Sequence, residues 1–277
     1  MTWRKIFSQT SVILLIFASI FYSATVAHAD NAVQAKIQQY TQEINKNPNK
    51  NAEIYNERGK SYRDIGKYDN ALADFNKAIE INPNFADAYN NRGVIYDICG
   101  KYELAIQNYN KAIELNPKFA RAYYNLGLIY SFYGKNYALA IKNFNKSIEI
   151  DPNKWSHYNR GVIYYYLKKY DAAIKDFDKV IEFDAKFTAG YGYRAACYVN
   201  LGQNEQAIKD SDKAIALYSS WSLVYNSRGR AYYNLGQYYR AISDFNKAIE
   251  LNSDDSEAYY NLGRVYKRLG DEKSSKK

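Results

Sequence analysis

Glycine returns at a fixed interval along most of this chain. The first glycine series has a step of 34 residues and comprises Gly59, Gly93, Gly127, Gly161, Gly229 and Gly263, with Ala195 filling the one vacant position. The second glycine series follows seven residues later and comprises Gly66, Gly100, Gly134, Gly202, Gly236 and Gly270, with Lys168 in the gap. A constant step of this length predicts a repeat architecture, in which each copy is one supersecondary unit that stacks on the next.

Other residue types recur in the same register. A tyrosine stands three residues after each position of the first glycine series, at Tyr62, Tyr96, Tyr130, Tyr164, Tyr198, Tyr232 and Tyr266. An alanine comes later, at Ala71, Ala105, Ala140, Ala173, Ala207 and Ala241. An aromatic residue then follows at Phe75, Tyr109, Phe144, Phe177 and Phe245, with Ser211 as the exception. The spacing is helical, and each copy is predicted to hold two helices, the first ended by a left-handed residue of the second glycine series.

The first glycine series lies inside the first helix of each copy. Glycine in a helix interior costs ~1 kcal/mol relative to alanine. We therefore expect the second, alanine-bearing helix to approach the first closely at these positions. One such pair cannot bury its apolar face alone, whereas stacked copies can.

This pattern resembles the tetratricopeptide repeat family, whose repeat is a helix–turn–helix of 34 residues. The resemblance covers about residues 52–268 and implies an all-α, right-handed α-solenoid. The expected repeats are residues 52–85, 86–119, 120–154, 155–187, 188–221 and 222–255. Residues 30–51 should form an N-terminal capping helix over 32–46 and a linker. Residues 256–270 should form a C-terminal capping helix that is a partial seventh repeat, and residues 271–277 should form a basic tail.

Two details of the repeats lead to further expectations. Repeat three has one extra residue near Asn136 and repeat four lacks one near Trp155, so we expect a local irregularity there. Cys99 and Cys197 occupy positions that apolar or small residues fill in other repeats, which places both in the predicted core. Several helix layers of ~8–10 Å should separate them. A disulfide needs Cα atoms within ~7 Å, so no bridge between them is expected.

The first 29 residues differ from the rest of the chain. Arg4 and Lys5 precede an apolar run over residues 11–22, and Ala27 and Ala29 occupy the positions of a small-residue cleavage site. This is the pattern of a secretory signal peptide over residues 1–29. A membrane-spanning helix needs ~20 apolar residues, which favours cleavage over a retained anchor. We expect an exported protein, periplasmic or secreted, without a stable membrane anchor after cleavage.

Composition and motifs give no support to an enzyme. The net charge is +9, and the cations are dispersed rather than gathered in a basic stripe, so nucleic acid is not an expected partner. The one histidine beyond residue 29, His157, stands where other repeats have tyrosine and is interpreted as a packing residue. No spacing predicts a metal site, and no cofactor is expected.

The first helices carry the variation that bears on function. At 100° per residue, the position two before each first-series glycine points away from the predicted core, and the resemblance implies that this face lines a concave, peptide-binding groove. Asn91, Asn125 and Asn159 hold that position in three successive repeats. A side-chain amide both donates and accepts hydrogen bonds, so these residues are candidate contacts to a peptide backbone. The alternative is that asparagine is simply common at this position.

An aromatic and apolar group is predicted beside these amides. It comprises Tyr124, Leu128, Phe132, Val162, Tyr165, Tyr166 and Tyr193. Exposed aromatic patches mark interaction sites, although tyrosine in this chain is abundant and mostly core. The C-terminal end of the same face is basic, and four residues there are candidate contacts to an anionic group: Arg230, Arg264, Lys267 and Arg268.

A further pattern is interpreted as structural. Arginine precedes the first-series position at Arg58, Arg92, Arg160, Arg194 and Arg228. Sixteen residues later stand Asp74, Asp176, Asp210 and Asp244, so an ion pair between packed helices is expected in four repeats. Repeat three has Leu126 and no aspartate.

These observations favour an exported module that binds a protein or peptide segment, as an adaptor or assembly factor. Two alternatives remain open. One is a self-associating scaffold of the cell envelope, and the other is a polyanion binder that uses the basic end.

Overall fold

The computed structural model describes residues 31–49, 51–218 and 220–275. The chain divides into two compact units, Met1–Asn125 and Leu126–Lys277, and each is described by itself. The predicted signal peptide over residues 1–29 lies outside the described residues, as do the last two residues of the predicted tail. Among the described residues, no helix has both the length and the apolar character needed to cross a bilayer.

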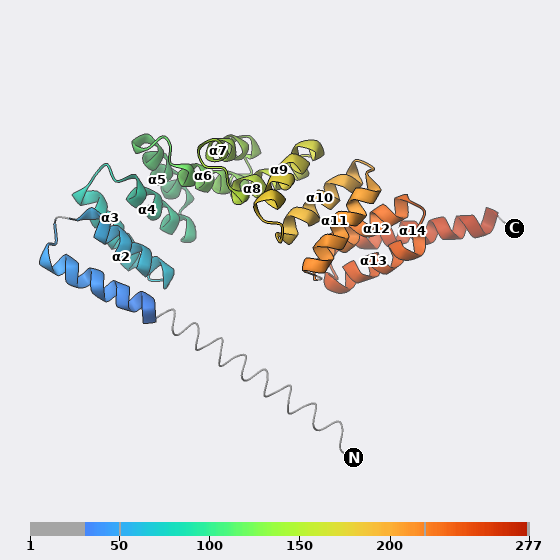
Figure 1. Cartoon of the computed structure of the whole chain (residues 1–277), viewed down its shortest axis with the longest axis horizontal. Coiled ribbons are helices and arrows are strands. Elements are labelled where there is room, and N and C mark those ends of the chain that lie inside the picture. Colours follow the sequence, from blue (N-terminus) through green and yellow to red (C-terminus); the bar gives the residue numbers. More distant parts are fainter. Residues whose placement is uncertain (1–30, 50, 219, 276–277) are drawn as a thin grey trace, which may run out of the picture. The chain divides into compact units, whose positions relative to one another are not determined.

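Every regular element in the described ranges is a helix, as Figure 1 shows. A helix over residues 31–46 opens the first unit, followed by α2 (Ala52–Asp64), α3 (Tyr68–Ile81), α4 (Ala86–Ile98) and α5 (Tyr102–Leu115). Helix α6 (Ala120–Phe132) contains the boundary between the units. The second unit continues with α7 (Tyr137–Ile150), α8 (Lys154–Tyr166), α9 (Tyr170–Phe183), α10 (Thr188–Asn200), α11 (Asn204–Leu217), α12 (Ser222–Asn234), α13 (Tyr238–Leu251) and α14 (Ser256–Ser275). The expected all-α architecture of paired helices is confirmed.

The turn inside most repeats is made by the second glycine series. Gly66, Gly100, Gly202 and Gly236 have φ between 71° and 75°, a left-handed conformation that glycine adopts without steric cost. Lys168 takes the same conformation in repeat four, with φ of 58°. In repeat three the extra residue moves the left-handed position from the glycine to Lys135, which is the irregularity expected there.

The first glycine series marks close contact between paired helices. A Cβ atom added at Gly161 would lie 2.9 Å from the ring of Phe177, and at Gly59 it would lie 2.7 Å from the ring of Phe75. The nearest neighbour is therefore the aromatic residue of the second helix rather than its alanine. Repeat five departs at both positions together, with Ala195 in place of glycine and Ser211 in place of the ring. Because serine is small, the extra methyl group of the alanine is accommodated.

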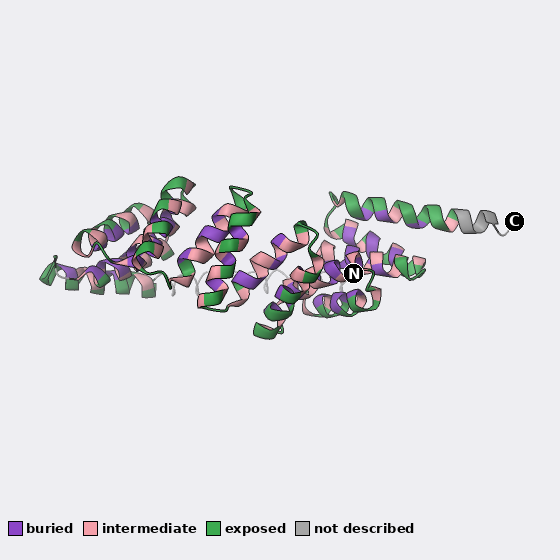
Figure 2. Ribbon diagram, turned by 90° about the horizontal axis from the view of Figure 1, so that it is seen from above, coloured by how far each residue is buried: buried purple, intermediate pink, exposed green. Residues whose placement is uncertain are grey.

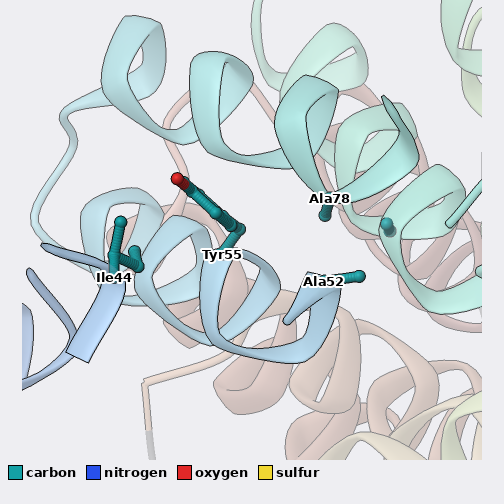
Figure 3. Packing of buried hydrophobic residues seen from close by; sticks show 5 residues of the cluster. Ile44, Ala52, Tyr55 and Ala78 are labelled. Atoms are coloured by element: carbon teal, nitrogen blue, oxygen red, sulfur yellow. The ribbon is translucent and has the colours of Figure 1, made fainter. Parts of the chain in front are cut away.

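Small residues and rings also join neighbouring repeats. In the first unit, Ile44 of the leading helix, Ala52 and Tyr55 of α2, and Ala78 of α3 share one buried cluster, shown in Figure 3. Figure 2 shows the same alternation on other helices, where buried and exposed faces run side by side. The expectation that both cysteines lie in the core is wrong for Cys99, which directly follows α4 and is exposed, and is confirmed for Cys197, which is buried. Both are free thiols.

The four predicted arginine–aspartate pairs are confirmed. In each, the guanidinium donates two hydrogen bonds to one carboxylate, as Arg194 does to Asp210 at 2.6 and 2.8 Å. The remaining Nη1 reaches back to the second helix of the preceding repeat, and that of Arg194 donates to Asp178 at 2.6 Å. The matching acceptors of the other arginines are Thr41, Asn76, Asn145 and Asp212. Each arginine therefore bridges three helices, an arrangement that the sequence analysis did not foresee.

Candidate protein-binding site

The asparagine side chains of the first unit do not face solvent as expected. Asn91 is only 4% exposed, and its amide donates to Asn56 of the preceding repeat at 2.8 Å. Asn125 is half-buried and donates in the same way to Asn90 at 3.1 Å. The expectation of a free amide row is wrong for these two, because adjacent first helices pack closely enough for the amides to bond one another. Both donors are engaged in joining repeats.

In the second unit the amide position behaves differently. Asn159 is half-buried and donates to the backbone carbonyl of Trp155 in its own helix at 2.9 Å. Asn261 is buried and donates to Asn226 at 3.2 Å, repeating the arrangement of Asn91. The amides of Asn91, Asn125 and Asn261 thus link successive first helices, whereas that of Asn159 bonds within its own helix.

The predicted tyrosines of the second unit come together. Tyr193 on α10 lies at the centre, stacked on Phe177 with ring centroids 5.6 Å apart and an interplanar angle of 13°. The rings of Tyr165 and Trp221 each lie 5.5 Å from it, and Tyr166 lies 5.4 Å from Tyr165. We call these residues, together with Tyr158 at 6.0 Å from Tyr193, the aromatic cluster. Ring pairs at such distances contribute roughly 0.5–1.5 kcal/mol each beyond their buried area, so the cluster is a firm surface.

Trp221 was missed by the sequence analysis. It precedes α12, and its ring packs so closely on α10 that a Cβ atom on Gly192 would clash with it. The signal was present in the sequence, because α10 carries two glycines outside the first glycine series, Gly190 and Gly192. Extra glycines inside a helix indicate that something bulky packs directly on its backbone.

The members of the aromatic cluster differ in exposure. Tyr165 and Tyr193 are half-buried, whereas Tyr166 is 62% exposed. Next to the cluster, Trp155 is 48% exposed and meets Phe187 edge-on at 5.5 Å, and Phe187 in turn lies 5.2 Å from Tyr158. Two exposed rings are therefore available to a partner, Trp155 at the start of α8 and Tyr166 at its end, with the half-buried rings of the cluster between them.

The other predicted apolar residues differ in exposure, and Val162 packs on the same buried core as the aromatic cluster. Leu128 is half-buried on α6, and Phe132 at the end of that helix is well exposed. Val162 is half-buried and packs against the core beneath α8. Tyr124, in the first unit, is half-buried.

Burial also shifts the pKa of the cluster's hydroxyl groups. It raises the pKa of Tyr165 to about 12 and raises the pKa of Tyr158 and Tyr193 as well. At neutral pH these phenols are hydrogen-bond donors that a carbonyl of a bound segment could accept from.

The raised pKa of Tyr165 predicts a loss of stability in alkali. Between pH 10 and about 12 the unfolded tyrosine loses its proton while the folded one keeps it, so the free energy of unfolding should fall as pH rises through this window. Urea unfolding at a series of pH values would measure this fall. The Tyr165→Phe variant should show a shallower decline, and Tyr239→Phe, which alters a highly exposed ring, should not.

The predicted basic end is only partly available. Arg230 donates to Glu257 at 3.1 Å and to Asn200 at 2.9 Å, so it already has partners. Arg264 lies over the ring of Tyr233 at 4.7 Å and remains exposed, as do Lys267 and Arg268. These residues form no closed anion site.

Chemistry-bearing groups elsewhere have structural roles. His157 is buried, and its Nδ1 lies 2.8 Å from a carboxylate oxygen of Asp176, which agrees with its interpretation as a packing residue. In the part of the chain that the structure describes, no group of three or more His, Cys, Asp and Glu side chains is arranged to hold a metal ion.

The chain is similar to several solved structures. It matches YrrB, described as a TPR protein with an unusual peptide-binding site, at 24% identity and a TM-score of 0.62, covering 67% of this chain and 96% of that one. It matches PilF of Pseudomonas aeruginosa at 19% identity and a TM-score of 0.66, covering 77% and 97%. PilW, described as a widely conserved type IV pilus biogenesis factor, matches at 18% identity and a TM-score of 0.59, covering 78% and 98%. At these identities the likeness concerns the fold.

Family models match most of the repeat region. The TPR repeat model matches residues 59–97, 98–131 and 229–270, and two tetratricopeptide repeat models match residues 120–154 and 155–187. No curated protein matches the sequence. The matched residues carry the glycines, tyrosines and close helix contacts described above, and this chain belongs to the tetratricopeptide repeat family.

Proposed function

We propose that this protein is an exported adaptor that binds a segment of another protein on the aromatic cluster of its second unit. The observation that carries the proposal is the exposure of Tyr166 beside a rigid base formed by Tyr165, Tyr193 and Trp221. A ring held in place by its neighbours loses little side-chain freedom when a partner covers it, so its burial contributes fully to affinity.

The family supports the coarser part of this proposal, because a tetratricopeptide repeat array suggests protein–protein interaction rather than catalysis. The pattern of residues 1–29 supports export. Because Trp155 and Tyr166 lie at opposite ends of α8, the bound segment is expected to present a separate apolar side chain to each of them.

The test is a photo-crosslinking residue placed at Tyr166 in cells. Tyr166 is preferable to Tyr165 because the latter is half-buried within the cluster. The matched control is the same residue at Lys179 on α9, whose side chain is 53% exposed and lies in no aromatic contact given by the structure. A distinct protein captured at Tyr166 and absent at Lys179 is the expected result. Identical capture at both positions, or crosslinks only to a second copy of this chain, would refute the proposal.

A further inference from the structure

Two turns of the second unit differ from the other turns of the array. The left-handed residue is glycine in the turns of repeats one, two, five and six, but it is Lys135 after α6 and Lys168 after α8. A residue with a side chain adopts this conformation at a steric cost that glycine avoids. These two turns therefore need an explanation beyond closing a helix pair.

The same two turns expose large apolar side chains. Phe132 and Tyr133 come just before the lysine of the first turn and are 64% and 54% exposed. Leu167 comes directly before the lysine of the second turn and is 39% exposed. Apolar side chains exposed as a group mark a surface that interacts with something other than water.

Both turns lie on one edge of a stack of antiparallel helices. Helix α6 packs on α7, where a Cβ atom on Gly127 would lie 2.6 Å from the ring of Phe144. The hydroxyl groups of Ser147 on α7 and Ser156 on α8 lie 3.0 Å apart. The arginine–aspartate pair of repeat four then joins α8 to α9. Because each helix runs opposite to the one before it, the turns after α6 and α8 emerge on the same side, and the connection between α7 and α8 lies on the other.

This side of the second unit is basic at both turns. We call six residues there the basic edge: Phe132, Tyr133, Lys135, Leu167, Lys168 and Lys169. All three lysines are exposed. No acidic residue occurs over residues 126–148, which contain the first turn, or over residues 152–170, which contain the second.

The basic character is confined to these two turns. The nearest acidic residue in sequence is Asp171 in the first turn of α9, and it offsets one of the three lysines. Its carboxylate lies near enough to Cys197 of α10 to help raise the pKa of that thiol, so it faces repeat five. The following turn of the second unit, after α10, has Gln203 and the exposed Glu205 and no cation.

Shape and charge together select the occupant of the basic edge. Side chains at the ends of helices form a projecting edge rather than a groove, which suits a broad surface better than a peptide segment. A second copy of the same edge would bring like charges together. Lysines attract the headgroups of anionic phospholipids, and neighbouring aromatic and leucine side chains can enter the boundary between headgroups and acyl chains. We propose that the basic edge docks this protein reversibly on the surface of an anionic phospholipid bilayer.

The test places an environment-sensitive fluorescent amino acid at Phe132 of the full chain. Its fluorescence should rise saturably with vesicles of equimolar phosphatidylglycerol and phosphatidylethanolamine, and the rise should weaken as salt is added. Vesicles of phosphatidylcholine alone should give little change. The matched control is the same amino acid at Phe183, which is half exposed at the end of α9, on the opposite edge, and should report no contact.

The left-handed lysines allow a variant that removes charge without harming the turn. A lysine beside an anionic membrane contributes about fivefold to partitioning. Lys135→Gly combined with Lys168→Gly should therefore raise the lipid concentration at half-saturation by about tenfold or more. Glycine suits both backbone positions, so the melting temperature should not fall. Lys186→Gln combined with Lys213→Gln removes the same charge from exposed positions away from the edge and should change binding by less than about twofold.

Several results would overturn the proposal. These are no saturable rise at residue 132, an equal rise at residues 132 and 183, an equal response to phosphatidylcholine, or equal losses in the two lysine variants. Residues 1–29 are common to every variant, so any lipid contact of that segment cannot distinguish residue 132 from residue 183. Capture of a protein at Tyr166 is measured separately, and the two proposals can fail independently.

Discussion

Replacing Asp176 by alanine is expected to lower the free energy of unfolding by about 3–5 kcal/mol. The carboxylate is nearly inaccessible and accepts hydrogen bonds from Arg160 at 2.6 and 2.9 Å. Its Oδ1 also lies 2.8 Å from the ring of His157. Removal leaves a largely buried guanidinium without its carboxylate, and that desolvated charge is the main source of the loss. Urea unfolding followed by circular dichroism would measure it.

The appropriate control is Glu182→Ala, which breaks an exposed pair with Lys179 and should cost less than about 1 kcal/mol. Asp178 is a poorer control than its exposure suggests, because it accepts a hydrogen bond from Arg194. Equal losses for Asp176→Ala and Glu182→Ala would mean that the buried pair contributes no more than a surface one.

The second large effect is expected from Phe177→Ala, at about 3–5 kcal/mol. The ring is fully buried, lies against Gly161 and carries the stacked ring of Tyr193. Its loss leaves a cavity that the surrounding helices fill only in part. The same unfolding measurement applies, and near-ultraviolet circular dichroism should report the loosened tyrosines.

Phe183→Ala provides a matched comparison on the same helix, since that ring is half exposed. It should change stability by much less. If both phenylalanine variants lose the same stability, Phe177 is not the support of the aromatic cluster that its packing indicates.

The helix pairs and the arginine–aspartate pairs could be predicted because the residues that form them recur at the same spacing in several repeats. A single Asp74 proves little, but the same arginine and aspartate at the same separation in four repeats indicate one geometry. The close contact at Gly161 follows from the same repetition, since no helix retains a costly glycine in successive copies without a packing reason.

The burial of the asparagines and the position of Trp221 could not be predicted from the pattern within one repeat. A helical wheel assigns Asn91 to the side away from the core of its own repeat. Its burial depends instead on the distance to the first helix of the preceding repeat, which the pattern within one repeat does not give. Trp221 stands in a loop, where periodicity carries no information, and only the glycines of α10 indicate its position.

The third hydrogen bond of each bridging arginine always points backwards along the chain. Arg228 reaches to Asp212 in the preceding repeat, and no arginine of this series reaches forward. As far as this hydrogen bond is concerned, loss of repeat six would leave only the exposed carboxylate of Asp212 without its partner, which costs little. Loss of an earlier repeat would instead remove a hydrogen-bond acceptor from the mostly buried guanidinium of the arginine that follows it, as Asp178 is the acceptor for Arg194. The array thus has a polarity of assembly, and gain or loss of repeats during evolution should be tolerated more readily at its C-terminal end.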